Sequence, residues 1–428
     1  MLQHELEMAS LKTSLNVRRF SVFVFIVFVT ILWILKGFPN PFKRYTLRST
    51  TDRFLAIERE IKRMKRKLED KSRIMELENY TKLAQYATPK VVLGYTTFFG
   101  QKPWKWLPNS DVFNHWEGIK CPYFQCRLTY DNKEYTKADA VLFHAFEMPG
   151  TFALSNLAKY RPKNQKWIYF ALENPDNNPR AVGLDNYFHW KINYRRDSDV
   201  FAPYGYYYPF SNKAEGEQYH SEINTGQKDK FVLWTVSHCD LPREDYVRKL
   251  LKYIKIDIYG ACAGNVGSKP APGKCIYNAK ECDVLKKRYK FQLALENSNC
   301  VDYITEKYWK AIDLGIVPVV LGGSGYGKEI AIPGSFIDVM QFKTVKDLAD
   351  YLTYLDKNDA EYRQYFEWRK TYRAVGSAPW SCTLCAALNI HTKTKAIPNL
   401  AEYWSSKKQC GVRDSKIREI LARESRRI

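Results

Sequence analysis

Short apolar runs alternate with amphipathic stretches over most of the chain, beginning at about Pro89. The runs have the length of buried strands, and the stretches between them repeat apolar residues at helical spacing. This alternation is typical of a parallel sheet with crossover helices. The expected strands form two sets, residues 90–98, 138–146 and 165–174, and then residues 230–237 and 254–260.

Between the two sets, residues Pro209–Lys230 are polar and show no periodicity. We expect an interdomain linker or a long exposed loop there. The pattern as a whole predicts an α/β protein in which two Rossmann-like halves face each other across a cleft.

An uncharged apolar run, Phe20–Leu35, precedes all of these elements. It is close to the roughly 20 apolar residues that a membrane-spanning helix needs, and Lys36 could reach the interface. We therefore expect a transmembrane anchor at residues 20–38 after a cytoplasmic tail at residues 1–19. A cleaved signal peptide is the alternative, but no small-x-small cleavage motif follows the run.

The predicted stem, residues 39–88, is polar and highly charged, but it carries one apolar stripe at alternating steps of three and four residues. Such spacing indicates a helix, and the stripe is too short to establish a coiled coil. A helical stalk, a stem-mediated homodimer and a solvated spacer helix all fit. The stripe consists of Phe54, Ile57, Ile61, Met64 and Leu68.

The 428 residues carry a net charge of +21, which suits nucleic acid, a membrane surface or a phosphorylated substrate. All ten cysteines follow the predicted anchor, and the sequon at Asn79 is useful only outside the cytosol. An oxidising lumen makes nucleic acid an unsuitable partner. The Cys382-x-x-Cys385 pair could serve zinc or redox chemistry, but without a second closely spaced pair we favour structural disulfides.

Candidate chemistry begins in Phe291–Gly323, which contains a strand, a loop, a helix and a second strand. Thr305 suits a helix N-cap, and Gly315 suits the helix end. Lys307 would add a full positive charge to a helix N-terminus that already attracts anions. Glu306 beside it could accept hydrogen bonds from sugar hydroxyls, although both residues could also be solvated surface groups.

Two further candidates follow strand ends. Arg243 lies between a strand and a helix, where it could bind phosphate bidentately, and Glu173 follows a strand just before a turn, where it could act as a general base. Each could equally be an ordinary surface or capping residue. Asp197-Ser198-Asp199 has the spacing of a manganese-binding acid pair, a pattern that also arises by chance.

Several ordered motifs resemble the Golgi α-1,3-fucosyltransferases, glycosyltransferase family 10. The stretch "YKFQLALENSNCVDYITEKYWKAIDLGIVPVVLGG" is similar to the family's donor-binding signature nearly end to end. "WIYFALENPDN", "YRRDSDVFAPYG", "FEWR" and "CTLC" match in order, so that the resemblance covers about Val91 to Cys385.

The resemblance implies the two-domain GT-B fold, with an acceptor-side domain at residues 89–225 and a domain that binds guanosine diphosphate fucose (GDP-fucose) at residues 226–375. Residues 376–428 would pack back on the first domain. It also implies site roles: Glu173 as catalytic base, Lys307 on the diphosphate and Glu306 on ribose. The remaining donor-binding residues would be Arg243, Asn297 and Tyr303. The chain departs from the family pattern before Arg243, because its strand ends in "VSH" and its loop reads "CDLP".

The implied reaction is inverting transfer of fucose from GDP-β-L-fucose to the 3-hydroxyl of N-acetylglucosamine, in a core or Lewis-type glycan. No cofactor or metal is expected to be required, with stimulation by Mn²⁺ left open. The resemblance further implies a single-pass Golgi membrane protein with a luminal catalytic domain, and disulfides joining Cys121 and Cys126 to Cys382 and Cys385. A noncatalytic glycan-binding protein and a manganese-dependent GT-A transferase are the alternative functions.

Overall fold

The computed structural model describes residues 51–68, 89–123, 125–178, 181–223, 225–273, 275–276, 279–390 and 395–425. All of them belong to one compact unit, Thr46–Ile428. The predicted tail, the predicted anchor and the sequon at Asn79 lie outside the described residues. Within the described ranges, no helix is both long enough and apolar enough to cross a membrane.

The first half of the described chain forms a six-stranded sheet in which every neighbouring pair is parallel. Apolar runs predicted as strands supply its centre, and both faces are covered, as expected for a parallel sheet. In spatial order its strands are β4 (Cys126–Thr129), β1 (Lys90–Gly94), β5 (Ala140–His144), β6 (Lys166–Ala171), β7 (Trp190–Asn193) and β8 (Val200–Phe201).

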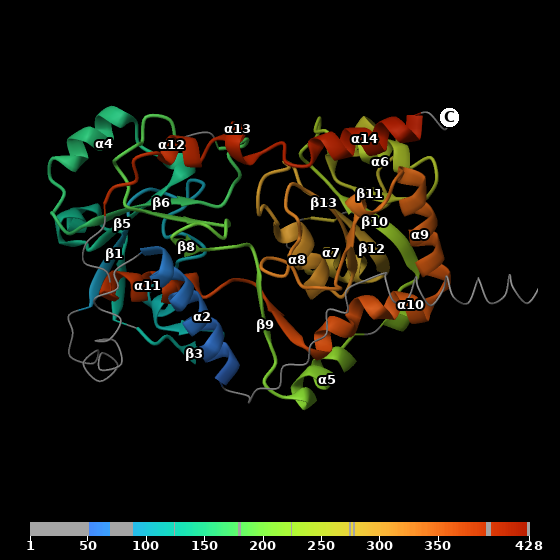
Figure 1. Cartoon of the computed structure of the whole chain (residues 1–428), viewed down its shortest axis with the longest axis horizontal. Coiled ribbons are helices and arrows are strands. Elements are labelled where there is room, and N and C mark those ends of the chain that lie inside the picture. Colours follow the sequence, from blue (N-terminus) through green and yellow to red (C-terminus); the bar gives the residue numbers. More distant parts are fainter. Residues whose placement is uncertain are drawn as a thin grey trace, which may run out of the picture. The chain divides into compact units, whose positions relative to one another are not determined.

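The second half forms a five-stranded sheet, again parallel throughout. Together the two sheets confirm the predicted α/β class with two parallel sheets (Figure 1). In spatial order the strands are β11 (Asp257–Tyr259), β10 (Lys230–Thr235), β12 (Tyr289–Leu295), β13 (Val317–Leu321) and β14 (Ile337–Asp338).

Helices connect and cover the strands. The α-helices are α2 (Thr51–Leu68), α4 (Thr151–Ala158), α5 (Lys213–Ser221), α6 (Arg243–Leu250), α7 (Lys280–Lys287), α8 (Glu306–Asp313), α9 (Val345–Lys357), α10 (Asp359–Arg363), α11 (Trp380–Ile390), α12 (Leu400–Tyr403), α13 (Ser406–Gln409) and α14 (Asp414–Ser425). Two small antiparallel pairs complete the strands: β2 (His115–Trp116) with β3 (Ile119–Lys120), and β9 (Tyr206–Pro209) with β15 (Tyr372–Val375).

Helix α2 corrects the prediction for the stem. The helix forms where the apolar stripe predicts it, but its stripe packs on the first half of the same chain and lies against α11 (Figure 1). Ile57, Ile61 and Met64 are buried in the first core, and so is Glu60, which pairs with Arg196. A stalk or a solvated spacer would leave this face exposed, and the face is not free to form a stem dimer.

The predicted linker is also corrected. Residues Pro209–Lys230 include the end of β9 and the whole of α5, because β9 pairs with β15 and α5 packs on the segment that precedes β15. Most of α5 is exposed, which explains the missing apolar period. Gly216 allows the close approach: a Cβ atom there would lie 2.0 Å from the carbonyl oxygen of Lys370.

The C-terminal segment, residues 376–428, divides between the two halves. Helix α11 contributes core residues on one face of the first sheet, and Leu400 and Trp404 at α12 pack in the core cluster on its other face, so both return to the first half as predicted. Helix α14 instead packs on α6 and α9 of the second half, with Ile417 and Ile420 in the second core. The expectation that the whole segment returns to the first half was therefore wrong for α14, whose apolar side chains complete the other core.

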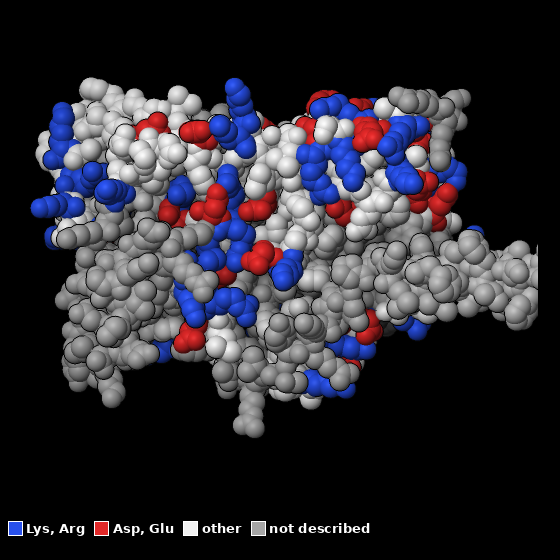
Figure 2. All heavy atoms as spheres, in the orientation of Figure 1, with Lys and Arg blue, Asp and Glu red and all other residues white. Residues whose placement is uncertain are grey.

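The basic excess is distributed among acidic groups. On the face drawn in Figure 2, Lys and Arg side chains near the middle and upper right are interspersed with Asp and Glu. Several described ion pairs join basic and acidic residues of different segments, among them Lys191–Asp199, Arg196–Glu60, Lys290–Asp356 and Lys310–Asp283. On the face drawn there, these regions do not form one uninterrupted basic patch of the kind that nucleic-acid binding favours.

Candidate active site

The predicted strand, loop and helix unit is present as β12, a loop and α8. Thr305 is the N-cap of α8, with its side chain accepting from the backbone N–H of Lys307. Gly315 ends the helix with a φ of 65°, a left-handed conformation that favours glycine. The parallel strand β13 then follows, so the N-terminus of α8 lies at the carboxyl edge of the second sheet.

The Lys307 ammonium group lies among three acceptors at this edge. Its Nζ atom is 2.8 Å from Thr305 Oγ1, 3.1 Å from Glu306 Oε1 and 3.2 Å from Glu296 Oε2. Burial by itself would lower the pKa of Lys307, but the carboxylates of Glu296 and Glu306 outweigh burial and raise that pKa. The side chain therefore carries a fixed positive charge at a largely enclosed position.

Glu296 ends β12 with a side chain that is fully buried. Its carboxylate accepts hydrogen bonds from the Thr305 N–H at 2.8 Å and from the Thr305 hydroxyl at 2.8 Å. Sequence reasoning missed this residue. The signal was available, because a carboxylate that continues an apolar strand must find a cation or several donors when it is buried.

Arg243 begins α6 and is also buried, at 5% exposure. Its Nη1 donates to the Leu295 carbonyl at 2.8 Å, and its Nη2 donates to the His238 carbonyl at 2.9 Å, while Nε has no hydrogen-bond partner. Burial lowers its pKa. The guanidinium group thus holds together the ends of β10 and β12, a bracing role that the sequence did not predict.

Groups from the first half reach this loop. The Tyr303 hydroxyl donates to Glu173 Oε2 at 3.1 Å, and the Asn174 side-chain amide donates to Asn297 Oδ1 at 3.2 Å. Tyr303 is buried against Tyr194, with ring centroids 4.9 Å apart. The structure therefore brings Glu173 to Tyr303 and Asn174 to Asn297, within the loop that leads into α8 and its residues Glu306 and Lys307.

The C-terminal segment fastens the same loop. Cys300 is disulfide-bonded to Cys410, the Val301 N–H donates to the Gln409 carbonyl, and the Val412 N–H donates to the Asn299 carbonyl. Among described residues, the metal-ligand grouping found consists of Asp176 with these two cysteines, whose sulfur atoms are already bonded to each other. That grouping offers a metal no thiolate ligand.

The two aspartates considered for manganese form ion pairs with basic side chains of the protein. Asp197 pairs with Arg195 and accepts from the Tyr403 hydroxyl at 3.0 Å. Asp199 pairs with Lys191, with Nζ and Oδ2 3.0 Å apart. Each carboxylate has its own positively charged partner, so the pair does not present two free acids to one ion.

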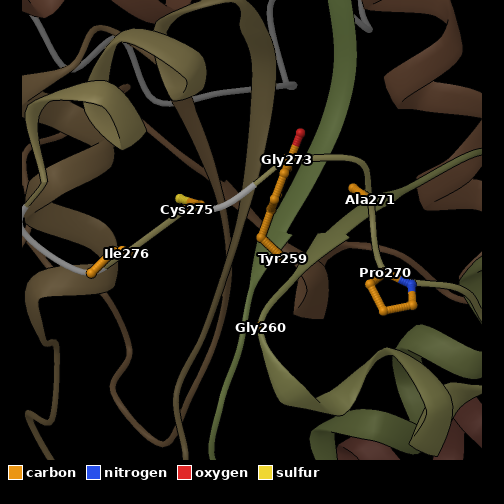
Figure 3. A pocket seen from close by; sticks show the side chains of 7 residues that line it. All are labelled: Tyr259, Gly260, Pro270, Ala271, Gly273, Cys275 and Ile276. Atoms are coloured by element: carbon orange, nitrogen blue, oxygen red, sulfur yellow. The ribbon is translucent and has the colours of Figure 1, made fainter.

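A pocket of about 260 Å³ lies at the carboxyl end of β11, beneath the cysteine-rich connection (Figure 3). Its lining consists of Tyr259, Gly260, Pro270, Ala271, Gly273, Cys275 and Ile276. Cys275 is bonded to Cys282, and Tyr259 is a phenol with a hydrogen-bond partner in Tyr289. The lining provides a binding surface without a carboxylate or a cation.

All ten cysteines are paired. Cys121 bonds to Cys382 and Cys126 bonds to Cys385, which is the arrangement that the resemblance implies. The connection after β11 adds two pairs, Cys239–Cys262 and Cys275–Cys282, and the fifth is Cys300–Cys410. No thiol in this arrangement is left for the zinc or dithiol chemistry considered for the C-x-x-C pair.

Comparison with known proteins agrees with this geometry. The family model "Glycosyltransferase family 10 (fucosyltransferase) C-term" matches residues 225–404, and "Fucosyltransferase, N-terminal" matches residues 87–205. The 4-galactosyl-N-acetylglucosaminide 3-alpha-L-fucosyltransferase FUT5 of Homo sapiens is 37% identical, over 65% of this chain and 72% of that protein. The 3-galactosyl-N-acetylglucosaminide 4-alpha-L-fucosyltransferase FUT3 of Bos taurus is 36% identical, over 70% of this chain and 80% of that protein.

A crystal structure of an alpha1,3-fucosyltransferase superposes with a TM-score of 0.45 at 16% identity, covering 66% of this chain and 82% of that one, a score too low to argue from. The family models and the sequence relatives are sufficient without it, since they span both sheets and the loop that carries Lys307. The chain belongs to glycosyltransferase family 10, and it is a fucosyltransferase.

Proposed function

We propose that the protein transfers fucose from GDP-β-L-fucose to the 3-hydroxyl of N-acetylglucosamine in glycoprotein glycans, with inversion at the anomeric carbon. Family membership supports the sugar, and the activities for which the relatives are named support an N-acetylglucosaminide acceptor. The observation that carries the proposal is the contact between Tyr303 and Glu173. It joins the candidate base to the loop that leads into α8, whose first turn carries the candidate phosphate-binding lysine.

In the proposed reaction, Glu173 accepts the proton of the acceptor 3-hydroxyl. The oxygen then attacks the fucose anomeric carbon opposite the diphosphate, the new C–O bond forms, and the bond to the phosphate oxygen breaks to release GDP. Tyr303 donates to Glu173 and so orients the carboxylate, while leaving its other lone pairs free for the acceptor. The transition state resembles an oxocarbenium ion.

Negative charge develops on the leaving diphosphate, and the N-terminus of α8 supplies the stabilising groups. Backbone N–H groups of the first turn and the Lys307 ammonium group provide preorganised positive charge. An ammonium group has three donors, and all three of those on Lys307 have acceptors within the protein. A diphosphate must therefore replace one of them, and Glu306 is the most exposed of the acceptors, at 38%.

Arg243 takes part in this proposal as a donor-site residue. Two of its donors are used on backbone carbonyls, and the Nε–H remains unpaired in a buried position. Asn297 follows Glu296 at the same strand end, where its amide could contact the donor. We assign ribose to Glu306, because its carboxylate, once released from Lys307, could accept hydrogen bonds from the sugar hydroxyls.

The arrangement of domains that we propose is GT-B, with an acceptor-side domain at residues 89–225 and a donor domain at residues 226–375. Two parallel sheets, each of which presents candidate residues at a carboxyl edge, support it. We propose a reaction that requires no metal, since Asp197 and Asp199 pair with protein cations; Mn²⁺ stimulation is left to measurement.

We also propose that the protein is a single-pass Golgi membrane protein with this domain in the lumen, glycosylated at Asn79. Five disulfides in the catalytic region support an oxidising compartment. The anchor would be residues 20–38. Helix α2 then follows it closely, so the stem would be short on the luminal side.

The test is incubation of a soluble fragment, residues 46–428, with labelled GDP-fucose and a panel of acceptors that end in N-acetylglucosamine or carry it in a glycan core. We expect transfer of fucose to one acceptor class, with the linkage read by nuclear magnetic resonance. A fragment that binds GDP and glycan but transfers nothing would favour the noncatalytic alternative. Activity that is abolished by a chelator and restored by Mn²⁺ would favour the metal-dependent one.

A further inference from the structure

Glu296 is a fully buried carboxylate for which neither the sequence motifs nor the family resemblance gives a role. It directly follows β12, and among the residues that the structure describes its two oxygens contact Thr305, the cap of α8, and Lys307 in the first turn. Ending a strand with a buried acid is unfavourable unless a cation or several donors compensate it. Here the compensation comes from one cap residue and one lysine.

The contacts of Glu296 and Lys307 form a closed group. Thr305 donates its backbone N–H and its hydroxyl to Glu296, and the same hydroxyl oxygen accepts from Lys307 Nζ at 2.8 Å. Glu296 Oε2 lies 3.2 Å from Nζ. Two of the three ammonium donors are thus directed at buried or capping groups, and the third is directed at Glu306, on the helix surface.

The three acceptors differ in their freedom to move. The Glu296 side chain has no exposed surface, whereas 38% of the Glu306 side chain is exposed. A ligand can displace Glu306 without disturbing the core, but it cannot displace Glu296. Glu296 therefore remains beside Lys307 whether or not a ligand is bound. Burial raises the pKa of the Glu296 carboxyl group, whereas the Lys307 ammonium group and the Thr305 donors favour its charged form. That charge acts on the ammonium group at short range in surroundings of low polarity.

We propose that Glu296 is a positioning residue: its fixed negative charge holds the Lys307 ammonium group charged and aimed at the site of the donor diphosphate. The inference rests on the proposed function, in which Lys307 binds that diphosphate. It goes beyond that function by assigning the lysine's position and charge to a residue that does not itself touch the ligand. If Glu296 served only to hold Thr305 at the start of α8, a neutral group of the same shape could accept the same hydrogen bonds, and the charge would not matter.

Two substitutions separate the charge from the shape. Glu296→Gln keeps the size and one acceptor oxygen but removes the charge, while Glu296→Asp keeps the charge and shortens the side chain by one methylene group. If charge is what matters, the Asp variant binds GDP more tightly than the Gln variant. If capping and packing are what matter, the better-fitting Gln variant binds GDP at least as tightly, and that order would overturn the proposal.

Binding is measured by calorimetry with GDP and with guanosine, which lacks phosphate. We expect Glu296→Gln to weaken GDP binding by roughly 10- to 100-fold, as for a charged group whose buried partner is removed, and to change guanosine binding little. Glu424→Gln is the matched control: it neutralises another fully buried glutamate of the second half, on α14, which contacts Tyr253 and Lys346. An equal loss for GDP and guanosine, or the same loss in the control, would contradict the proposal.

The pH dependence gives a third readout. Lys307 has a raised pKa in the intact protein, so GDP affinity should be constant from about pH 6 to 9 as far as this group is concerned. Without the Glu296 charge, Glu306 alone opposes the effects of burial and of Arg243, so the pKa of Lys307 falls relative to the unsubstituted protein. GDP affinity should then decline, relative to the unsubstituted protein, as pH rises. Parallel profiles would overturn the inference. Failure of the unsubstituted protein to bind GDP would instead refute the proposed function.

Discussion

The carboxylate of Glu173 meets the acceptor in the proposed reaction, and its replacement gives the most direct test of the chemistry. Glu173→Gln should lower kcat by roughly 10²- to 10⁴-fold, the usual contribution of a general base. GDP affinity should be almost unchanged, because the residue lies on the acceptor side and contacts the donor loop only through Tyr303. The measurement is kcat with saturating donor, beside calorimetry with GDP.

Asp176 supplies the matched control for that substitution. It is an exposed carboxylate three residues along the same turn, and it accepts hydrogen bonds from the hydroxyls of Ser298 and Ser406. Asp176→Asn should leave kcat within a few-fold of the unsubstituted value. If Glu173→Gln behaves the same way, Glu173 is not the base.

Glu306 should affect two ligands in opposite directions. In the unliganded site it accepts from Lys307 Nζ at 3.1 Å, and in the proposed complex it accepts from ribose. Glu306→Ala should therefore weaken GDP binding by roughly tenfold, through lost hydrogen bonds to a charged acceptor. The same change should strengthen pyrophosphate binding by roughly two- to fivefold, since a competing, partly exposed ion pair is removed.

Calorimetric titration with both ligands checks this prediction. A variant in which pyrophosphate binds less tightly would show that Glu306 supports the diphosphate site instead of competing for it. Equal weakening of GDP and pyrophosphate would point to a distorted helix start. Lys307→Ala serves as the reference, because it should weaken both ligands.

At the residue scale, strand-end reasoning predicted where candidate groups would lie but not what they would touch. Lys307 and Glu306 were expected at a helix N-terminus following a strand, and they are there. Glu296 was missed because its importance arises from complete burial, which depends on how α8 lies against β12. The carbonyl contacts of Arg243 join two loop ends distant in sequence, so spacing could not reveal them.

At the element scale, α2 illustrates the same limit. Its stripe of apolar residues predicted a helix, and a helix formed, but periodicity does not identify the surface that covers the stripe. That surface is the first core together with α11, and α11 lies more than 300 positions later in the sequence. The predicted strands succeeded for the opposite reason, since a run that is apolar on both faces leaves few alternatives to the centre of a parallel sheet.

Helix α2 should stabilise the catalytic region. A fragment that begins at residue 80 exposes the core positions that Ile57, Ile61 and Met64 cover, whereas a fragment that begins at residue 46 retains them. Burial of each such side chain contributes about 1.5–3 kcal/mol before the cost of ordering the helix. We expect the shorter fragment to melt at least about 5 °C lower by calorimetry. Equal melting temperatures would show that α2 contributes nothing.

Glu60 makes the attachment of α2 dependent on pH. Burial raises the pKa of its carboxyl group, but the Arg63 and Arg196 guanidinium groups outweigh burial and hold that pKa below its usual range. A group with a lowered folded pKa stabilises the fold above its unfolded pKa, near 4.5, and loses that contribution as pH falls through the folded value. Stability from Glu60 should thus be complete at neutral pH and decline in acid.

Glu60→Gln should lower the melting temperature at pH 7, and the difference from the unsubstituted protein should shrink below about pH 4. Glu58→Gln is the control on the same helix, because Glu58 is exposed. A deficit for Glu60→Gln that stays constant down to low pH would contradict the assigned ion pairs. A deficit for Glu58→Gln of equal size would show that charge on α2 in general is responsible.

At the scale of the whole molecule, the chain path places the second half between two parts of the first. Disulfides join Cys121 to Cys382 and Cys126 to Cys385, and the entire second sheet lies between those positions in sequence. The chain then returns along the donor loop through Cys410 before α14 packs on the second half. Each half therefore depends on segments that are separated in sequence by the other.

This path predicts unequal contributions from disulfides of the same chemistry. In the loop-closure model, a cross-link stabilises by restricting the unfolded chain, and its effect grows with the loop that it closes. Cys121–Cys382 and Cys126–Cys385 close the same long loop, with sequence separations of 261 and 259 residues, whereas Cys275–Cys282 closes a separation of 7. Because either long-range disulfide keeps that loop closed, both must be removed to open it. Replacing all four of their cysteines by alanine should cost about 5 kcal/mol, and replacing Cys275 and Cys282 about 2 kcal/mol.

Denaturant unfolding of the fourfold variant and the double variant measures this difference, with peptide mapping to verify that the remaining disulfides have formed. The fourfold variant should also become sensitive to proteolysis in the segment that leads to α11, because α11 then remains on the first sheet through apolar contacts alone. If the two variants lose equal stability, α11 stays close to the first sheet even in the unfolded chain. The short-loop variant should keep GDP affinity, since Cys275 lines a pocket without a charged group.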